Sequence, residues 1–157
     1  MKRLLIVTSS RWEGFGTLPT REFYRKWPYS LGAICFRLEE RGWETRRLAF
    51  ADTFSPLTLA RQIDAYRPSV VYTYGSLTAL HPLWCRRRLC RHKDFKIVHG
   101  WDDVYGEIWR GVYGWLPGRF MTRMERQIIT RSDAVVTLSR YNQMRGRRWG
   151  VECRFIP

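Results

Sequence analysis

The sequence predicts an α/β fold in which a parallel sheet of about six strands carries helices on both faces. Short apolar runs alternate with helical segments along the chain, which is the pattern of parallel strands joined by right-handed crossover helices. The 157 residues are 45% hydrophobic and include eight Trp, enough to bury a core and too apolar for a disordered tail. We therefore expect one domain over residues 1–157, with no repeat or low-complexity segment.

The strands are predicted from short apolar runs. The opening run at 3–8 is typical of a strand buried on both faces. The run SVVYTY at 69–74 combines β-branched and aromatic residues, which favour strands. By these criteria the six predicted strands are 3–8, 44–50, 69–74, 96–99, 134–138 and 151–156.

Capping and breaking residues delimit the predicted helices. Gly42 and Gly150 are placed to end helices, because glycine adopts the left-handed conformation that follows a last helical turn. Arg67–Pro68 ends another helix, since a proline disfavours helix at the residue before it. Pro117–Gly118 is expected to interrupt a helix that begins at Tyr105. The other predicted helices are 31–41, 55–66, 75–89, 119–130 and 139–149.

The charge of the chain is strongly positive. Lys and Arg number 28 against 14 acidic residues, for a net charge of +14. Such a field attracts phosphate, whether on nucleic acid, an anionic membrane or a nucleotide sugar. Because most of the cations are Arg, they suit bidentate phosphate contacts. The charge therefore indicates the chemistry of the partners and not the fold.

The four cysteines indicate neither a zinc site nor a disulfide framework. Cys85 and Cys90, with His92, are the nearest approach to a metal cluster, but buried thiols fit their helical setting better. We expect no bound metal, and a reduced, cytoplasmic setting. The apolar run at the N-terminus is too short for a signal peptide, and no stretch reaches the ~18 residues of a membrane span.

The loops that follow the strands hold the candidate ligand-binding residues, because ligands of parallel sheets bind at the carboxyl ends of the strands. Gly14, Gly16 and Gly32 follow the first strand and could bring backbone N–H groups close to an anion. They do not form a G-x-G-x-x-G motif, and a flexible surface loop is the equal alternative. Ser76 lies at a helix start after the third strand, where an ordinary N-cap is the simpler interpretation.

The loop after the fourth strand is the richest in chemistry. Its His99, Asp102 and Asp103 are the candidate catalytic residues, since carboxylates at a strand end can bind sugar hydroxyls or act as a base. The alternatives are a helix N-cap for Asp103 and a buried strand histidine for His99. The functional interpretation is therefore favoured most clearly for Asp102.

Four segments, in order, resemble the N-terminal domain of GT-B glycosyltransferases, most closely the retaining family 4. They are KRLLIVTSS near the start, SLGAICFRLEERGWET, RPSVVYTYGSLTAL, and the ending MERQIITRSDAVVTLSRYNQMRGRRWGVECRFIP. Each segment alone is a weak signal, but together they span nearly the whole chain. The resemblance implies a Rossmann-like domain that binds the acceptor and faces a donor-binding domain across a cleft.

Carried over to this sequence, the resemblance implies roles for several residues. The region from Gly14 to Gly32 would line the cleft near the donor phosphates, and His99–Asp103 would lie beside the transferred sugar. Ser139 and Arg140 would begin a helix that faces the cleft. Many relatives carry a His-Asp pair where this chain has Trp101-Asp102.

The resemblance also implies partners. The donor-binding half would follow Pro157, so we expect a C-terminal domain or partner subunit to be required and the chain alone to be inactive. The donor would be a nucleotide sugar, used as a substrate with no further cofactor, and the acceptor a glycan or a lipid-linked molecule. Donor diphosphate stabilisation is central to such transfer, and one half of the cleft cannot provide it.

Basic residues cluster or are interleaved with aromatic residues in three segments, of which the first, at 21–27, combines Arg and Lys with Phe, Tyr and Trp. Residues 86–93 are rich in Arg, and residues 109–126 mix Trp, Tyr and Phe with Arg. Such segments suit an anionic membrane interface, although a solvated charged face is the equal alternative. A nucleic-acid-binding module is the competing function, but the Arg residues are spread through the chain and no reader motif occurs. Receiver and flavodoxin-like domains are disfavoured, because the first loop lacks their acidic or phosphate-binding residues.

Overall fold

The computed structural model describes residues 2–8, 31–49, 55–75 and 77–156. It confirms the predicted fold class: six parallel strands form one sheet in the order β2-β1-β3-β4-β5-β6. The chain turns back past β1 to reach β3, so the topological switch point lies between these two strands. The strands are β1 (Lys2–Thr8), β2 (Trp43–Ala49), β3 (Val70–Tyr74), β4 (Lys96–Gly100), β5 (Ala134–Thr137) and β6 (Cys153–Phe155).

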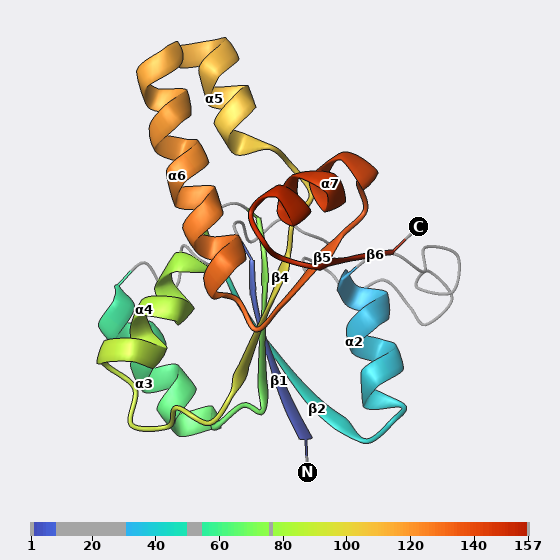
Figure 1. The fold of residues 1–157 in the computed structure, drawn as a ribbon. Helices are drawn as coiled ribbons and strands as arrows, with labels where there is room; N and C mark the ends of the chain where they lie inside the picture. The colour runs from blue at the N-terminus through green and yellow to red at the C-terminus, as the bar shows by residue number, and fades with distance from the viewer. Residues whose placement is uncertain (1, 9–30, 50–54, 76, 157) are drawn as a thin grey trace.

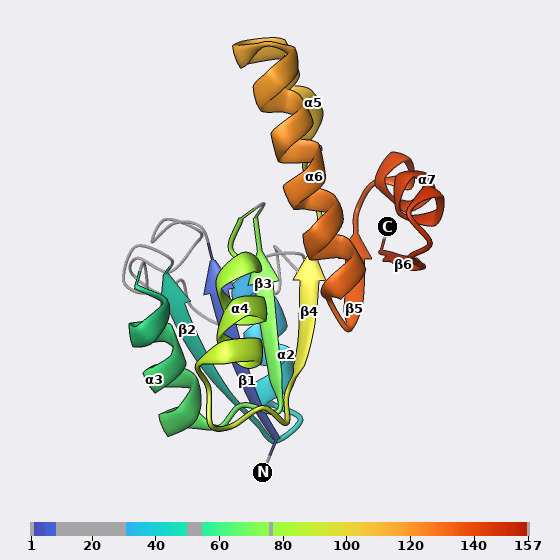
Figure 2. The same cartoon turned by 60° about the vertical axis from the view of Figure 1, so that its left-hand side comes forward.

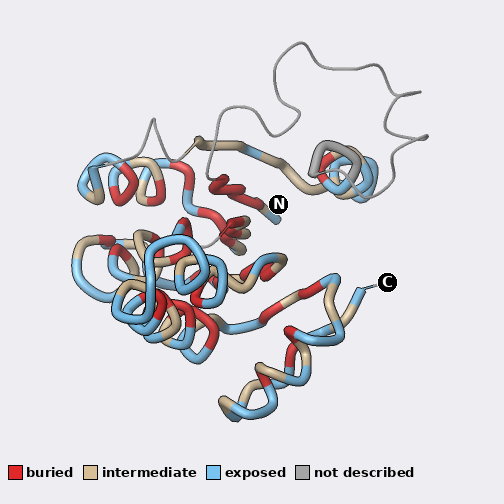
Figure 3. Tube along the Cα trace, turned by 90° about the horizontal axis from the view of Figure 1, so that it is seen from above, coloured by how far each residue is buried: buried red, intermediate tan, exposed pale blue. Residues whose placement is uncertain are grey.

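Helices cover both faces of the sheet, as predicted (Figure 1). On one face, α3 and α4 cover a core built around Leu5, Val71 and Ile97 of the strands. On the other face, α2 covers Leu4 and Ile6. Seen from above, the buried residues gather on the strands and on the inward sides of the helices (Figure 3). The helices are α2 (Leu31–Glu39), α3 (Pro56–Tyr66), α4 (Leu80–Arg88), α5 (Tyr105–Tyr113), α6 (Trp115–Arg131) and α7 (Arg140–Arg148).

The pair α5–α6 forms a hairpin that rises beyond the carboxyl ends of the strands (Figure 2). The two helices pack closely because glycine occupies their contact. A Cβ on Gly118 would lie 2.7 Å from the Arg110 Cα, and one on Gly106 would lie 3.0 Å from the Thr122 Cα. Larger side chains would therefore push the helices apart.

The predicted break at Pro117–Gly118 is wrong, and the chain turns at Gly114 instead. Gly114 has φ 93° and ψ −178°, a conformation that is accessible essentially only to glycine. Pro117 falls in the first turn of α6. Backbone N–H groups in a first turn have no acceptor within the helix, so a proline there removes no helical hydrogen bond. The helix boundary was therefore set by the glycine, and the proline simply fits the turn after it.

A second set of interactions attaches α6 and α7 to the end of the sheet. Trp101, which follows β4, is buried together with Ile129 of α6 and Val135 of β5. Its ring stacks on Trp149 at a centroid separation of 5.5 Å. Gly146 of α7 lies so close to β6 that an added Cβ would be 2.4 Å from the Cys153 Sγ. The base of the hairpin and α7 thus share one small aromatic core.

Candidate functional site at the carboxyl edge

The carboxyl ends of all six strands lie at one edge of the sheet, because every pairing is parallel. Of the residues predicted to bind ligand, Gly14, Gly16 and Ser76 lie outside the described part of the chain. Gly32 lies in the first turn of α2. The described loops at this edge follow β3, β4 and β5.

His99 is buried within the sheet, with 2% of its surface exposed. Its Nδ1 is 2.9 Å from the hydroxyl of Thr73, its register partner on β3. Burial lowers the pKa of His99 from 6.5 to about 4, although the charge of Asp102 opposes the shift. The ring is therefore neutral near pH 7. This is the geometry of the buried strand histidine that the sequence offered as the alternative to a catalytic role.

Gly100 ends β4 beneath two tyrosines of β3. A Cβ at this position would lie 2.4 Å from the Tyr72 hydroxyl and 3.0 Å from the Tyr74 ring. The absence of a side chain therefore lets the Tyr72 hydroxyl approach the β4 backbone just before the acidic loop. Sequence reasoning did not find this pair, because the alternating pattern of β3 explains both tyrosines as ordinary strand residues.

The two carboxylates after β4 differ in setting. Asp102 is half-buried, and its Oδ1 accepts a hydrogen bond from the backbone N of Asp103 at 3.0 Å. Asp103 is exposed, and it is not the N-cap of α5, because that position is Val104 and no side chain caps the helix. The N-cap alternative for Asp103 is therefore wrong. The loop keeps the Asp102 carboxylate close to the strand end and leaves Asp103 in solvent.

Asn142 of α7 holds the acidic loop in place. Its side chain is fully buried, and its Nδ2 donates to the carbonyl oxygens of Trp101 at 3.3 Å and Asp102 at 3.0 Å. Its Oδ1 is buried with no hydrogen-bond partner among the described residues. Asn142 thus ties the loop after β4 to the helix after β5, although 40 residues separate it from Asp102.

A network of charged side chains centred on the buried Glu125 supports the same loop. The Trp101 indole N–H donates to Glu125 of α6 at 2.9 Å. Arg145 of α7 bridges Glu125 at 3.4 Å and Glu107 of α5 at 2.6 Å, and its guanidinium lies over the Trp149 ring. Burial raises the pKa of Glu125 above its usual range, while the Trp101 hydrogen bond and the Arg145 charge oppose the shift. Three helices and the β4 loop are joined in this way.

Ser139 and Arg140 lie at the start of α7, where they were predicted. The Ser139 hydroxyl caps the helix by accepting from the Asn142 backbone N at 3.4 Å. Arg140 is exposed, and its guanidinium lies 5.7 Å from the centre of the Phe155 ring. The start of α7 is therefore beside the acidic loop, since Asn142 contacts both.

The loop after β3 differs from its prediction. The N-cap position of α4 is Ala79, and no side chain caps that helix. Thr78 instead donates its hydroxyl to the carbonyl oxygens of Tyr74 at 3.0 Å and Gly75 at 2.9 Å. The helix therefore begins five residues later than the predicted start at 75, after a turn that Thr78 stabilises.

The family of this domain follows from a comparison with known protein families. Residues 15–157 match the model of the Glycosyl transferase 4-like domain. The chain belongs to this family. No curated protein matches the sequence. The resemblance to family 4 glycosyltransferases and the Rossmann-like sheet are thus both confirmed for this glycosyltransferase domain.

Within the described residues of this glycosyltransferase domain, no group of three His, Cys, Asp or Glu residues is placed to hold a metal ion. All four cysteines are free and buried, so Cys85 and Cys90 are core thiols as expected. In the same residues, no helix combines the length and the apolar character needed to cross a bilayer.

The arrangement brings together only part of what the sequence predicted. Asp102, Ser139 and Arg140 lie around the contact between the β4 loop and α7, whereas the His99 ring is enclosed beneath them. Glu125, Asn142 and Arg145 also contact the β4 loop or one another, and sequence reasoning missed them. A polar residue inside an amphipathic helix could have flagged Asn142, but its partner was not readable from the pattern. Chemically, the edge offers one half-buried carboxylate, a capped helix start and an exposed guanidinium.

Proposed function

We propose that this glycosyltransferase domain is the acceptor-side half of a GT-B enzyme. The enzyme would transfer a sugar from a nucleotide-sugar donor to a glycan or lipid-linked acceptor. The observation that carries this proposal is the family match over residues 15–157. The four buried, free cysteines suit a reducing compartment, which supports a cytoplasmic location.

Asp102 is the proposed acceptor-side carboxylate. Its loop is fixed by two hydrogen bonds from Asn142, and fixed groups contribute more to transfer than mobile ones because they do not reorganise as the reaction proceeds. The carboxylate would bind a sugar or acceptor hydroxyl. The start of α7, with Ser139 and Arg140, would favour a negatively charged group beside it.

The proposal also requires a second half. Sugar transfer depends on stabilising the departing diphosphate, and the carboxyl edge of one sheet provides a surface on one side only. A donor-binding domain or subunit would close the cleft against this edge. We therefore expect the chain alone to have no turnover.

A transfer assay tests both parts of the proposal. The purified chain, alone and together with the polypeptide encoded immediately downstream, is incubated with radiolabelled nucleotide sugars and a membrane extract as acceptor. We expect labelled product only from the combined sample. Turnover by the chain alone would contradict the need for a second half, and no turnover in either sample would contradict the transferase role.

The role of Asp102 is tested by Asp102→Asn in the active sample. Loss of a charged hydrogen-bond acceptor should lower turnover by about tenfold or more. Asp94→Asn is the matched control, since Asp94 is exposed and precedes β4 at the opposite edge of the sheet. Equal activity of the two variants would remove Asp102 from the site.

A further inference from the structure

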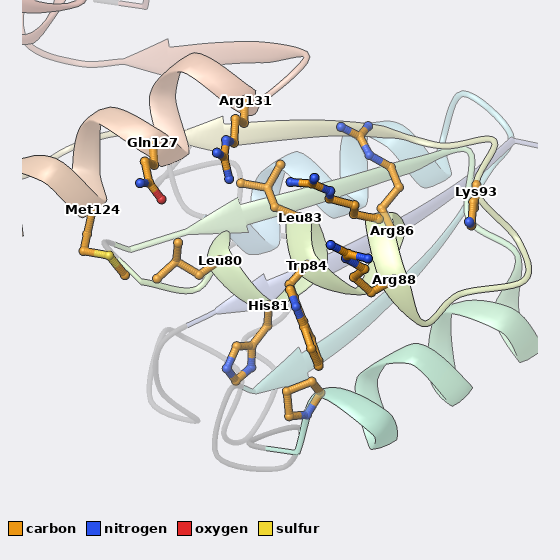
Figure 4. A pocket seen from close by; sticks show the side chains of 12 residues that line it. Leu80, His81, Leu83, Trp84, Arg86, Arg88, Lys93, Met124, Gln127 and Arg131 are labelled. Atoms are coloured by element: carbon orange, nitrogen blue, oxygen red, sulfur yellow. The ribbon is translucent and has the colours of Figure 1, made fainter.

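A groove of about 990 Å³ runs along α4, on the face of the sheet that α3 and α4 cover. Most of its lining residues belong to α4, and α6 forms one wall, from which Met124 and Arg131 point toward α4 (Figure 4). The start of α3 contributes Pro56, and the segment after α4 contributes Lys93. The groove, here called the α4–α6 groove, is therefore separate from the candidate site at the Asp102 loop and the start of α7.

One end of the α4–α6 groove is apolar. Leu80 and Leu83 of α4 and Met124 of α6 line this end and are partly buried. Trp84 lies one turn after Leu80 on α4, and 48% of its surface is exposed. A large aromatic side chain of this kind, set among partly buried apolar neighbours, is a frequent anchor point of protein interfaces.

The other end of the groove is cationic. Four exposed cations line it, and the described lining includes no acidic residue. The four are Arg87, Arg88, Lys93 and Arg131. Within the part of the chain that the structure describes, none of the four forms an ion pair, whereas the fifth lining cation, Arg86, is paired with Asp133. The positive field at this end is therefore available to an anionic partner.

We propose that the α4–α6 groove binds an acidic, amphipathic segment of a second protein. Apolar side chains of the segment would contact Leu80, Leu83 and Trp84, and its carboxylates would contact the four exposed cations. The nine residues of α4 give the groove a length of about 13 Å, which matches two to three turns of a helix laid into it. The inference goes beyond the proposed function, because binding in this groove does not depend on sugar transfer.

The composition and shape of the groove favour a protein over other occupants. Trp, Met and Arg are enriched in the cores of protein interfaces, and acidic residues are depleted there. Nucleic acid would satisfy the arginines but would leave Leu80, Leu83 and Met124 without an apolar partner. A bilayer is entered by side chains that project from a convex face, whereas these three line a groove between two helices.

Charge also disfavours a second copy of this chain as the occupant. The protein has a net charge of +14, so two copies would bring cationic surfaces together at the groove. A segment rich in Asp and Glu has the complementary charge, which speeds association and selects against cationic competitors.

A synthetic peptide binding to the full chain tests the proposal. The probe is a fluorescein-labelled peptide of Leu and Glu, about four helical turns long, with its Leu residues on one helical face. Fluorescence anisotropy measures its affinity. We expect saturable binding that weakens as salt is added. A peptide with Ser in place of Leu should bind about tenfold more weakly or worse, because it cannot bury apolar surface against Trp84.

Two groove variants separate the apolar and the cationic contributions. Trp84→Ala should weaken binding of the Leu-Glu peptide by about tenfold or more, as expected for an aromatic anchor. Arg87→Gln/Arg88→Gln/Arg131→Gln should weaken it by about tenfold, because each exposed ion pair contributes a factor of about two to five.

Each groove variant has a matched control. Trp115→Ala removes an exposed tryptophan from the start of α6, at the other end of that helix from Arg131. Arg37→Gln/Arg41→Gln/Arg148→Gln removes three exposed arginines from elsewhere and has the same net charge as the groove triple. Both controls should change binding less than about threefold. All the substituted residues are exposed, so unchanged circular dichroism and melting temperature verify folding.

Every other outcome would overturn the proposal. No saturable binding of the Leu-Glu peptide would remove an acidic segment as the occupant, and equal binding of the Ser-Glu peptide would leave charge as the only cause. Equal losses in groove and control variants would place binding elsewhere on the chain. Binding of single-stranded DNA or of anionic vesicles that the groove variants lose, with peptide binding unchanged, would assign the groove to nucleic acid or to lipid. Concentration-dependent dimers lost in Trp84→Ala would assign it to a second copy.

Discussion

Two regions along the sheet are stabilised by different physics: the part under α3 and α4, here called the α3–α4 side, and the end at β5 and β6, here called the α6–α7 side. The α3–α4 side buries eleven residues in one cluster, and most are aliphatic or aromatic. The α6–α7 side buries four residues in its cluster, and it relies in addition on the buried side chains of Glu125 and Asn142 and on the partly buried Arg145. Apolar packing tolerates many arrangements of similar volume, whereas a buried hydrogen-bond network requires one.

The region held by hydrogen bonds is also the region that positions the candidate site. The side that carries α3 and α4 supports the sheet. The α6–α7 side fixes the Asp102 backbone through Asn142 and fixes the hairpin through Arg145. The polar side thus connects the candidate site to the α5–α6 hairpin, and the apolar side provides the rigid platform.

Removing Arg145 should produce the largest loss of stability. Arg145→Met leaves the buried Glu125 carboxylate without its cation, which should lower the free energy of unfolding by about 3–5 kcal/mol. The penalty should shrink at lower pH, because burial already raises the pKa of Glu125 and a protonated carboxyl needs no partner. Urea unfolding at two pH values measures both effects.

A double variant separates charge from packing in this network. Arg145→Met with Glu125→Leu removes both charges and should recover most of the lost stability, since an apolar pair of similar volume can replace a buried ion pair. The Trp101 indole N–H keeps the Asp103 carbonyl oxygen, 3.0 Å away, as its acceptor. If the double variant is as unstable as Arg145→Met, packing rather than an unpaired charge explains the effect, and the contrast between the two sides is lost.

The apolar side should respond to volume alone. Ile63 of α3 is fully buried in the larger cluster, so Ile63→Ala should cost about 3 kcal/mol and Ile63→Val about 1 kcal/mol. Neither cost should depend on pH, because no titratable group of the network is involved. Denaturant midpoints across the same pH range give the comparison, and a pH-dependent penalty would show that the two sides are coupled.

The elements on both sides were largely predictable from the sequence because they follow local rules. The run at 69–74 became β3 (Val70–Tyr74), and the predicted helix-ending residues Gly42 and Gly150 both have φ of 79°. The break at Gly114 was missed because the neighbouring proline looked like the stronger breaker. Its position in the first turn of α6 makes it compatible with the helix.

The candidate site was predictable only where it depends on strand ends. Asp102 could be placed because it follows β4 directly, and Ser139 because it precedes α7. Asn142 and Arg145 could not be paired with the loop and hairpin, since their partners lie 20 to 41 residues away in sequence. Local patterns give the polarity of such residues but contain no information on which distant group they meet.

The smallest expected effect concerns His99, a titratable residue within the sheet. Its pKa of about 4 lies below the 6.5 usual for histidine, so between these values the unfolded chain binds a proton that the folded chain does not. Stability contributed by the neutral ring is therefore present above about pH 6.5 and is lost as the pH falls toward 4. The loss between about pH 7.5 and pH 5 should be about 2 kcal/mol.

His99→Asn isolates this contribution, because an amide can retain a hydrogen bond to Thr73 and does not titrate in this range. The stability difference between the protein and this variant should therefore narrow by about 2 kcal/mol from pH 7.5 to pH 5. Parallel pH profiles would mean that the ring takes up a proton in the folded state. Such a ring would be accessible to solvent or substrate, and His99 would then return to the candidate site beside Asp102.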